Sequence, residues 1–455
     1  MSVLDQIVKA YDIRGTVPDQ FGEPVARALG VGFASLVRAV EPATEQVIVA
    51  RDMRPSGPRL VGAFTEGVLA QGLSVVDIGL ASTDMMYFAA GRYDAPGAMF
   101  TASHNPAGYN GIKLCFSGAR PVGADTGLSD VKAVAQQVLD DAGPNDVSVP
   151  GTRTERTDVL EGFVEHVLSF VDGIDIGPLR VVADTANGMG GLVVPALFER
   201  LGVELEVLFG ELDGTFPNHP ADPLQPANQR DLRARVVAGG FDVGLAFDGD
   251  ADRVFVVDET GAGLSGSTTT AILAAATLRD HPGATILHNL ICSKAVPDVI
   301  RELGGTPVRT KVGHSFIKQS MAETGAVFGG EHSAHYYFAD NYNADSGLIA
   351  SLLVLAEMSR ESTPLSVIRE RFERFSSSGE INTEVADASA VIELVSAAYE
   401  HCEQDRLDGL TVDAGDWWFN LRPSNTEPLL RLNLEASDRA ACDERVAEVL
   451  AIVTA

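Results

Sequence analysis

Short apolar segments alternate with polar loops and longer helical segments along most of the 455-residue chain. This alternation indicates βαβ units and mostly parallel sheets, which places the chain in the α/β fold class. Several of the apolar segments end directly in a polar loop, which is where open α/β sheets place their ligand sites. We predict strands at 46–50, 74–79, 180–184, 203–209, 241–247 and 284–288, and helices at 58–71, 231–239 and 295–303.

The pattern changes in the last part of the chain. Residues 381–385 and the segments WWFNL and LLRLNLEA are predicted strands, and 389–401 and 438–452 are predicted helices, so we expect a smaller α+β domain there. Linkers rich in turn residues, near 144–154, 257–263 and 374–380, separate this domain from three α/β blocks with a similar pattern. The expected domains are 1–149, 150–258 and 259–373, which are α/β, and 374–455, which is α+β.

The charge of the chain excludes some classes of partner. Acidic residues outnumber basic ones 63 to 34, which gives a formal net charge of −29. Such a surface repels phosphate backbones and anionic lipid, so we expect no nucleic-acid or membrane partner. The N-terminus lacks the features of a signal peptide, and the longest apolar run is too short to span a bilayer. The four cysteines form no CxxC pair, and together these features predict a cytoplasmic protein.

The segment DGDADR carries three carboxylates, Asp248, Asp250 and Asp252, directly after a predicted strand. Carboxylates at alternate positions can converge on one hard cation through oxygen, and Mg²⁺ fits a site with few protein ligands and room for a phosphate oxygen. An EF-hand loop is the first alternative, but Arg253 occupies the position that needs glycine and the flanks are strand-like. A solvated acidic turn is the second, and it explains poorly three acids behind a buried strand.

The segment TASHNP places Ser103 at the end of another predicted strand, with His104 beside it. A serine in this position is a candidate nucleophile, although an ordinary Ser/Asn turn has the same composition. No GxSxG elbow is present, so an α/β-hydrolase is not supported. Lys113 follows in NGIK and is one of only six lysines; it is a candidate phosphate contact or proton-transfer group, or a surface lysine.

The segment GEHSAH combines a carboxylate, a hydroxyl and an imidazole, which together suit recognition of a polyol. If the segment is extended, alternation places Glu331, Ser333 and His335 on one side. A zinc site is not supported, because HEXXH is absent. His314 in KVGHS either joins this site or has a structural role.

The segment RPSNT groups guanidinium, hydroxyl and amide donors in a tight loop, which is a good phosphate cradle. The alternative is a plain turn between two strands, which does not explain the donor set Arg422, Ser424, Asn425 and Thr426. One cation site beside one hydroxyl suggests phosphoryl transfer, and a separate cradle suggests a substrate held by a phosphate that does not react.

Taken in order, the segments AYDIRG, TASHNP, DGDADR, GEHSAH and RPSNTEP make the chain resemble the α-D-phosphohexomutase superfamily. Within it, the chain is similar to the bacterial phosphomannomutase/phosphoglucomutase group. The resemblance implies three related α/β domains, with mixed and mostly parallel sheets, and a C-terminal α+β domain around a central cleft. It also implies an isomerase that moves a phosphoryl group within a hexose phosphate.

The resemblance assigns roles to residues of this chain. It implies that Ser103 carries the phosphoryl group and, with Asp248, Asp250 and Asp252, binds Mg²⁺. The implied catalytic residues are Arg14, Ser103, His104, Lys113, Arg253 and His314. The implied substrate-binding residues are Tyr11, Lys294, Glu331, Ser333, His335, Arg422, Ser424, Asn425 and Thr426. The base that takes the hydroxyl proton is left open between Lys113 and a histidine.

The implied reaction interconverts mannose 1-phosphate and mannose 6-phosphate, and also the glucose phosphates, through a hexose 1,6-bisphosphate that serves as activator and intermediate. The motifs YDIRG and SNTEP favour this group over glucosamine mutases, which typically have TDGIRG-like and SGTEP motifs. The alternatives are a phosphoglucosamine mutase, a metal-dependent sugar phosphatase and a catalytically dead phosphosugar-binding protein. Pro423 and Ala251 depart from the common pattern of the family. We expect hexose phosphates as the only partners, and a monomer or weak homo-oligomer.

Overall fold

The computed structural model describes residues 2–423 and 429–454, and of His314 only the backbone. Within it the chain divides into two compact units. The first unit comprises Met1–Leu264 and Ser333–Ser366, and the second comprises Ser265–His332 and Val367–Ala455.

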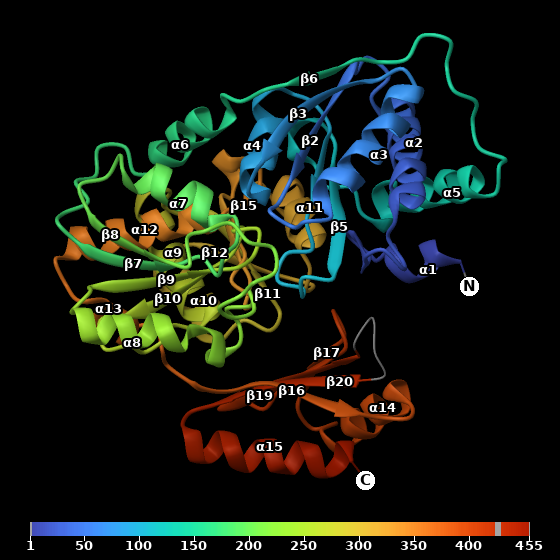
Figure 1. The fold of residues 1–455 in the computed structure, drawn as a ribbon. Helices are drawn as coiled ribbons and strands as arrows, with labels where there is room; N and C mark the ends of the chain where they lie inside the picture. Colours follow the sequence, from blue (N-terminus) through green and yellow to red (C-terminus); the bar gives the residue numbers. More distant parts are fainter. Residues whose placement is uncertain (1, 424–428, 455) are drawn as a thin grey trace. The chain divides into compact units, whose positions relative to one another are not determined.

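The first unit begins with a mixed sheet of six strands (Figure 1). Strands β4, β2, β3 and the edge strand β6 are parallel to one another. Strand β5 is antiparallel to β4, and β1 at the other edge is antiparallel to β5. In order across the sheet the strands are β1 (Ile13–Thr16), β5 (Tyr109–Cys115), β4 (Gly97–Phe100), β2 (Gln46–Arg51), β3 (Ser74–Leu80) and β6 (Arg153–Glu155). The helices of this part are α1 (Val3–Ile7), α2 (Glu23–Val40), α3 (Gly57–Ala70), α4 (Thr83–Arg92) and α5 (Leu128–Leu139), with 3₁₀ turns at Ser117–Ala119 and Ala124–Thr126.

Helices cover both faces of this sheet, which explains why β2 and β4 are buried along nearly their whole length. Successive side chains of a strand point to opposite faces. Val47 and Val49 of β2 belong to the core that includes residues of α2, α3 and α5, whereas Ile48 between them does not. Helix α4 contacts β2 and β4, so we assign it to the face that Ile48 occupies. The predicted strand 46–50 and helix 58–71 are confirmed within one residue.

A second sheet in the first unit has four strands, of which three are parallel and β10 is antiparallel. In order they are β10 (Val254–Asp258), β9 (Val243–Phe247), β7 (Arg180–Asp184) and β8 (Glu204–Leu208). Helix α12 contacts β10 and α6. The helices are α6 (Val159–Ser169), α7 (Gly190–Phe198), α8 (Arg230–Gly239) and α12 (Gly347–Glu361), with 3₁₀ turns at Pro226–Gln229 and Ala339–Asn341 and a hairpin of β14 (Tyr336–Phe338) and β15 (Ala344–Asp345).

A buried carboxyl joins α4 to the start of α12. Asp84 Oδ2 accepts a hydrogen bond of 2.6 Å from Ser346 Oγ, and Ser82 Oγ donates to Asp84 Oδ1. Burial raises the pKa of Asp84 to about 7. The hydrogen bonds from Ser346 and Ser82 favour the charged form, but burial outweighs them.

This pKa gives the folded state a specific dependence on pH. Because the folded carboxyl holds its proton up to about pH 7 and the unfolded carboxyl loses it near 3.8, stability falls as pH rises through that window. Relative to Asp84→Asn, the wild type should lose on the order of a few kcal/mol between about pH 4 and 7. Urea unfolding at several pH values measures this difference. The exposed Asp130→Asn is the control, and a difference independent of pH would contradict the assignment.

The second unit contains a parallel sheet and an antiparallel sheet. In the parallel one, β11 (Thr285–Asn289) pairs with β12 (Thr306–Thr310) on one side and with β13 (Phe328–Gly330) on the other. The helices are α9 (Gly266–Asp280), α10 (Ala295–Glu302) and α11 (His314–Thr324), and the short α13 (Leu365–Glu370) crosses from the first unit into the second.

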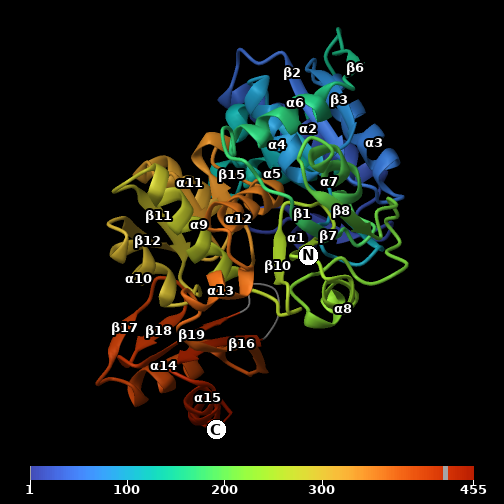
Figure 2. The ribbon, with the colours of Figure 1, turned by 90° about the vertical axis from the view of Figure 1, so that its left-hand side faces the viewer.

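The antiparallel sheet carries α14 (Ala388–Ala398) and α15 (Arg439–Val453) side by side on one face (Figure 2). Its core contains Trp417, Phe419, Leu432 and Val449, which come from the sheet and from α15. In order the strands are β16 (Ser376–Glu384), β20 (Leu429–Ala436), β19 (Trp417–Pro423), β18 (Leu410–Asp413) and β17 (Glu403–Asp405).

The predicted fold class is therefore confirmed: the sheets that precede the C-terminal part are mixed and mostly parallel, and the C-terminal sheet is antiparallel. Within the described residues, no helix is both long enough and apolar enough to cross a membrane. The predicted domain boundaries at 149, 258 and 373 stay predictions.

Candidate active site

Ser103 lies in the loop that follows β4. Its backbone has a φ of 49°, in the left-handed region that residues other than glycine seldom adopt. Its N–H donates a hydrogen bond of 2.9 Å to Thr101 Oγ1, and its buried hydroxyl donates one of 2.8 Å to Asp248 Oδ2. The position after a strand and the strained backbone together direct this hydroxyl at one carboxylate.

Asp248 is the first of three buried aspartates in the turn between β9 and β10. One carboxylate oxygen from each of Asp248, Asp250 and Asp252 lies within 4.8 Å of the others. The Oδ1 atoms of Asp250 and Asp252 are buried, and neither has a hydrogen-bond partner among the described residues. Buried carboxylate oxygens without a partner are costly, and an oxygen-binding cation would satisfy them. The residues therefore fit a divalent metal ion.

The backbone of this turn explains two residues of the motif. Gly249 is required, because a Cβ there would lie 2.4 Å from the Ser103 carbonyl oxygen. This close approach brings the serine and the aspartates together. Ala251 has a φ of 61°, which favours glycine, the residue that the resemblance predicts at this position.

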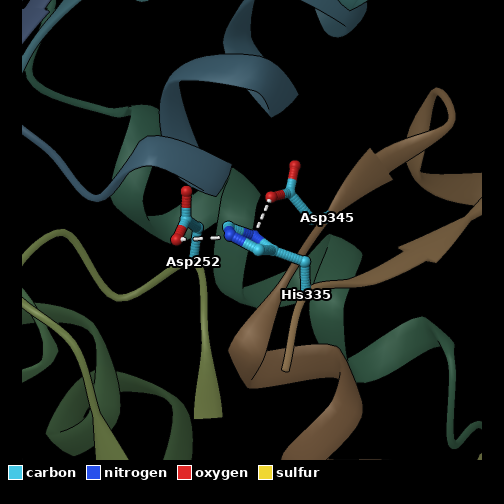
Figure 3. Close-up of side chains that lie close together, drawn as sticks. All are labelled: Asp252, His335 and Asp345. Atoms are coloured by element: carbon cyan, nitrogen blue, oxygen red, sulfur yellow. Dashed lines mark hydrogen bonds and ion pairs between the residues drawn. The ribbon is translucent and has the colours of Figure 1, made fainter. Parts of the chain in front are cut away.

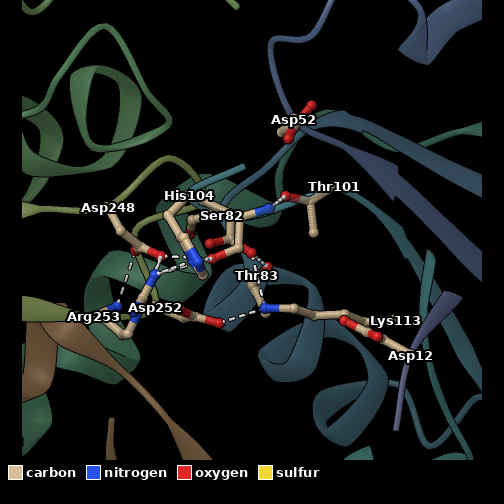
Figure 4. A network of polar contacts seen from close by, with 12 residues as sticks. Asp12, Asp52, Ser82, Thr83, Thr101, His104, Lys113, Asp248, Asp252 and Arg253 are labelled. Carbon is tan, nitrogen blue, oxygen red and sulfur yellow. Dashed lines mark hydrogen bonds and ion pairs between the residues drawn. The ribbon is translucent and has the colours of Figure 1, made fainter. Parts of the chain in front are cut away.

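Two cations neutralise part of the acidic charge. Lys113 on β5 donates hydrogen bonds of 2.9 Å to Asp250 Oδ2 and 2.6 Å to Asp252 Oδ2. Arg253 Nη2 donates one of 2.8 Å to Asp248 Oδ2 and lies 3.3 Å from Ser103 Oγ (Figure 4). Both side chains are buried, so their positive charges act on the acidic turn in a medium that screens little.

These charges separate the pKa values of Asp248 and Asp250. Burial raises the pKa of Asp248 to about 7, and the neighbouring carboxylates Asp250 and Asp252 add to the effect against Arg253. Burial also disfavours ionisation of Asp250, but Lys113 outweighs it and lowers the pKa of that carboxyl. Burial likewise opposes the charge on Lys113, and the two carboxylates raise its pKa well above the usual value. Lys113 is therefore an ammonium ion here.

His104 is neutral in this arrangement. Burial, with the nearby charge of Arg253, lowers its pKa to about 2. Arg253 Nη2 donates a hydrogen bond of 2.6 Å to His104 Nδ1, which assigns the ring proton to Nε2. Arg14 on β1 contacts the same loop, because its Nη1 donates a hydrogen bond of 2.6 Å to Asn105 Oδ1.

His335 reaches the acidic turn from the hairpin side (Figure 3). Its Nδ1 is 2.8 Å from Asp345 Oδ2 and 3.9 Å from Asp252 Oδ1. Burial lowers the pKa of His335, but the two carboxylates outweigh it and raise the pKa above its usual value. Its backbone also forms an isolated bridge with Arg253.

The extended conformation considered for GEHSAH is wrong. Strand β13 ends at Gly330, and the chain turns through residues 332–334, with a φ of 65° at Ala334. Alternation therefore does not place Glu331, Ser333 and His335 on one side. Ser333 and His335 belong to the first unit, and Glu331 belongs to the second.

Within the second unit, buried Glu331 follows β13. Its Oε1 accepts hydrogen bonds from Asn289 Nδ2 at 3.3 Å and from the Gly313 N–H at 3.1 Å. Lys294 precedes α10, and its Nζ donates to Asp413 Oδ1 at 2.9 Å. His314 is the first residue of α11, and its side chain lies outside the described part.

Arg422 lies on β19, where its Nη2 donates a hydrogen bond of 3.2 Å to Glu380 Oε2. Its buried Nε has no hydrogen-bond partner within residues 2–423 and 429–454. The other predicted members of the cradle, Ser424, Asn425 and Thr426, lie outside the described residues. Tyr11 is two residues before β1, in the first unit.

Four family models match consecutive segments of the chain. They describe phosphoglucomutase/phosphomannomutase alpha/beta/alpha domain I at residues 5–138, domain II at 161–262, domain III at 265–375 and the C-terminal domain at 380–452. The chain belongs to the phosphoglucomutase/phosphomannomutase family. The predicted resemblance is therefore confirmed, and the chain is an isomerase that transfers a phosphoryl group.

Relatives of this phosphohexomutase match it over nearly their whole length. A Xanthomonas campestris pv. campestris protein described as phosphohexose mutases is 41% identical over 97% of both chains. The phosphomannomutase of Salmonella montevideo is 38% identical over 98% of both. Among solved structures, a phosphoglucomutase/phosphomannomutase family protein from Burkholderia thailandensis is 33% identical, covers 100% of this chain and 97% of its own, and has a TM-score of 0.89.

A more distant structure shares the fold alone. It is the Aspergillus fumigatus N-acetylphosphoglucosamine mutase in complex with GlcNAc-6P and magnesium, which is 14% identical over 99% of this chain and 98% of its own, with a TM-score of 0.62.

The sequence analysis missed several polar residues at the site of this phosphohexomutase. Thr83 Oγ1 donates a hydrogen bond of 2.6 Å to Asp250 Oδ2, and Asp345 binds His335. Asn105 lies within the predicted serine loop, and Arg54 lies in the polar loop after β2. A signal was available for Arg54, because its loop follows an apolar strand as the other site loops do. Thr83 gave no such signal.

Proposed function

We propose that this phosphohexomutase interconverts mannose 1-phosphate and mannose 6-phosphate, and also the glucose phosphates, through phosphorylated Ser103 and a hexose 1,6-bisphosphate. The observation that carries the proposal is the 2.8 Å hydrogen bond from Ser103 Oγ to Asp248 in the buried acidic turn. A hydroxyl beside a cation-binding turn and two buried cations is suited to carrying a phosphoryl group.

The phosphoryl group would pass from Ser103 to the free hydroxyl at C1 or C6, and the other phosphate of the bisphosphate would then return to Ser103. Lys113 and Arg253 supply fixed positive charge at the serine, which lowers the energy of the charge that develops during transfer. Mg²⁺ held by Asp248, Asp250, Asp252 and the phosphoserine supplies further charge neutralisation at the phosphoryl oxygens. Arg14 donates a hydrogen bond to Asn105 of the serine loop, and it is proposed as a further catalytic residue there.

A histidine rather than Lys113 is proposed as the proton acceptor. Lys113 is held as an ammonium ion by two carboxylates, so it has no lone pair to accept a proton. His104 accepts from Arg253 at Nδ1 and carries its proton on Nε2, so its accepting nitrogen is occupied. His335 with its proton on Nδ1, facing Asp345, would leave Nε2 available. We assign the acceptor role to His335.

The remaining predicted residues are proposed to bind the sugar and its second phosphate. Glu331 and Ser333 would bind sugar hydroxyls, and Arg422 would bind the phosphate that does not react. The same proposed role extends to Tyr11, Lys294, Ser424, Asn425 and Thr426, whereas His314 is proposed as a catalytic residue. We also propose hexose 1,6-bisphosphate as the activator, four domains with boundaries at 149, 258 and 373, a cytoplasmic location, and a monomer or weak homo-oligomer.

Phosphorus NMR of the purified protein tests the function. With Mg²⁺ and a trace of hexose bisphosphate, mannose 1-phosphate and glucose 1-phosphate should each convert to the 6-phosphate. Conversion of glucosamine 6-phosphate alone would make the chain a phosphoglucosamine mutase. Release of free phosphate would indicate a phosphatase, and no change with any sugar would indicate a binding protein.

Arg422→Ala should raise KM for the hexose phosphate about 10- to 100-fold, because it removes a charge-assisted hydrogen bond to the phosphate. The effect on kcat should be smaller, since the proposed contact is to the phosphate that does not react. Steady-state kinetics with a coupled assay measures both constants. Arg431→Ala is the matched control, because Arg431 Nη1 also pairs with Glu380, at 3.3 Å. Equal KM values for wild type and Arg422→Ala would relocate the phosphate site.

A further inference from the structure

The loop of Ser103 surrounds a buried arginine that the proposed reaction does not use. Arg54 follows β2 and is fully buried. Its guanidinium donates hydrogen bonds to four backbone carbonyls of the serine loop. Nη2 donates to Ser103 O at 2.8 Å and Asn105 O at 2.7 Å, and Nη1 donates to Pro106 O at 2.8 Å and Tyr109 O at 3.0 Å.

The fifth donor of the guanidinium is also used. Arg54 Nε donates a hydrogen bond of 3.1 Å to Asp52 Oδ2, and Asp52 Oδ1 accepts the Arg54 N–H at 3.0 Å. Neither side chain of this pair is exposed. An arginine has five N–H donors in a fixed plane, and here each of its nitrogens has an acceptor. Burial of the charge is therefore compensated by a complete set of hydrogen bonds.

One of the carbonyls that Arg54 holds belongs to Ser103, the proposed phosphoryl carrier. The Ser103 backbone is in the left-handed region, with a φ of 49°, which a serine leaves readily unless contacts hold it. The same carbonyl lies against Gly249, so its direction is fixed from both sides. Since Cα joins the carbonyl to the side chain, fixing this carbonyl limits where the Ser103 hydroxyl can point.

Another segment closes over the arginine. The ring of Phe216 lies 5.2 Å from Arg54 Cζ, and a Cβ on Gly214 would be 2.6 Å from Arg54 Cα. The guanidinium is therefore held between its own loop, the serine loop and residues 214–216, and it has little freedom to move.

We propose that Arg54 is a positioning residue, which holds the serine loop in the conformation that directs the Ser103 hydroxyl to the acidic turn. The inference rests on the proposed function of Ser103 as the phosphoryl carrier. Arg54 does not touch the reacting atoms, so its loss should affect the transfer step more than the binding of the sugar.

Arg54→Lys tests this, because lysine keeps the charge but has three donors on one atom and cannot hold four carbonyls and Asp52. We expect kcat to fall about 100-fold while KM stays within about threefold, since a displacement of about 1 Å at a reacting group has this effect. The rate at which hexose bisphosphate phosphorylates Ser103, followed by intact-protein mass spectrometry, should fall by the same factor. Arg59→Lys, an exposed arginine on α3, is the matched control and should equal the wild type.

Hydrogen exchange gives a readout that does not depend on activity. In Arg54→Lys the amides of residues 101–110 should exchange at least about tenfold faster, with the other strands of the sheet unchanged. If Arg54→Lys does not fold, Asp52→Asn tests the positioning role of Arg54, because it removes the carboxylate partner of Nε. This variant should lower kcat about tenfold at constant KM.

Two results would overturn the inference: a kcat within about threefold of wild type in a folded variant, or a loss that appears in KM alone. An inactive wild type would instead refute the proposed function, and the exchange rates of residues 101–110 would still test whether Arg54 holds the loop.

Discussion

Ser103→Ala is expected to lose at least about 1000-fold in kcat, because the variant has no atom to which the phosphoryl group can be attached. The hydroxyl of Ser103 is the group that contacts Asp248 and Arg253. Turnover of mannose 1-phosphate in a coupled assay measures the loss. Mass spectrometry should find one phosphoryl group on the wild type after treatment with hexose bisphosphate, and none on the variant.

The loss should not come from unfolding. Removal of one hydroxyl hydrogen bond changes stability by only about 1 kcal/mol, so thermal unfolding of Ser103→Ala should remain close to that of the wild type. Ser129→Ala, which removes an exposed hydroxyl on α5, is the matched control and should have normal turnover. A Ser103→Ala protein with near-normal kcat, or with a phosphoryl group elsewhere, would refute the role of Ser103.

The parts of the site that the sequence predicted are local. Asp248, Asp250 and Asp252 converge because they share one turn after β9, so their spacing alone constrains their geometry. Ser103 was predicted for a related reason, since it ends a strand of a parallel sheet, where ligand sites lie. The position of a polar residue at the end of a strand depends only on a few neighbouring residues. The periodicity of the strand therefore predicts it.

The contacts that complete the site depend on pairs far apart along the chain. Lys113 is 137 residues from Asp250, and Thr83 is 167 residues from it. No pattern near Thr83 distinguishes it from any other threonine at the start of a helix, where such residues are common caps. Only the packing of the two sheets of the first unit specifies these pairs, so a single sequence without its fold does not contain them in a readable form.

The segment GEHSAH shows how a local rule fails. Alternation of sides holds only while the backbone is extended, and Ala334 turns the chain instead, with a φ of 65°. An alanine gives no warning of a left-handed backbone, because glycine or asparagine is the usual residue there. The condition on which a shared side for Glu331 and His335 was predicted is therefore not met, although each residue lies near polar partners.

Asp250→Asn is expected to weaken binding of a divalent cation at least about 100-fold, because the ligand set loses one of its three negative charges. Asp250 Oδ1 is buried and has no hydrogen-bond partner in the described part of the chain, whereas Oδ2 accepts hydrogen bonds from Lys113 and Thr83. An asparagine can present its oxygen to Lys113 and Thr83, and its NH₂ group then replaces the free oxygen with a donor that repels a cation. The substitution therefore removes the metal ligand and keeps the size of the side chain.

Titration of Mn²⁺ into the folded variant, followed by EPR, measures this without any need for turnover. The Mg²⁺ concentration for half-maximal activity should rise in parallel with the Mn²⁺ dissociation constant, which links the binding site to the reaction. Asp231→Asn on α8, where the carboxylate is exposed, is the matched control and should bind Mn²⁺ as the wild type does.

Because Lys113 would keep only Asp252 as a charged partner, some loss of stability is expected as well, and it can be separated from the binding effect by thermal unfolding in the absence of metal. Unchanged Mn²⁺ affinity in a folded Asp250→Asn protein would exclude Asp250 as a ligand and would leave Lys113 as the cation that the turn exists to hold.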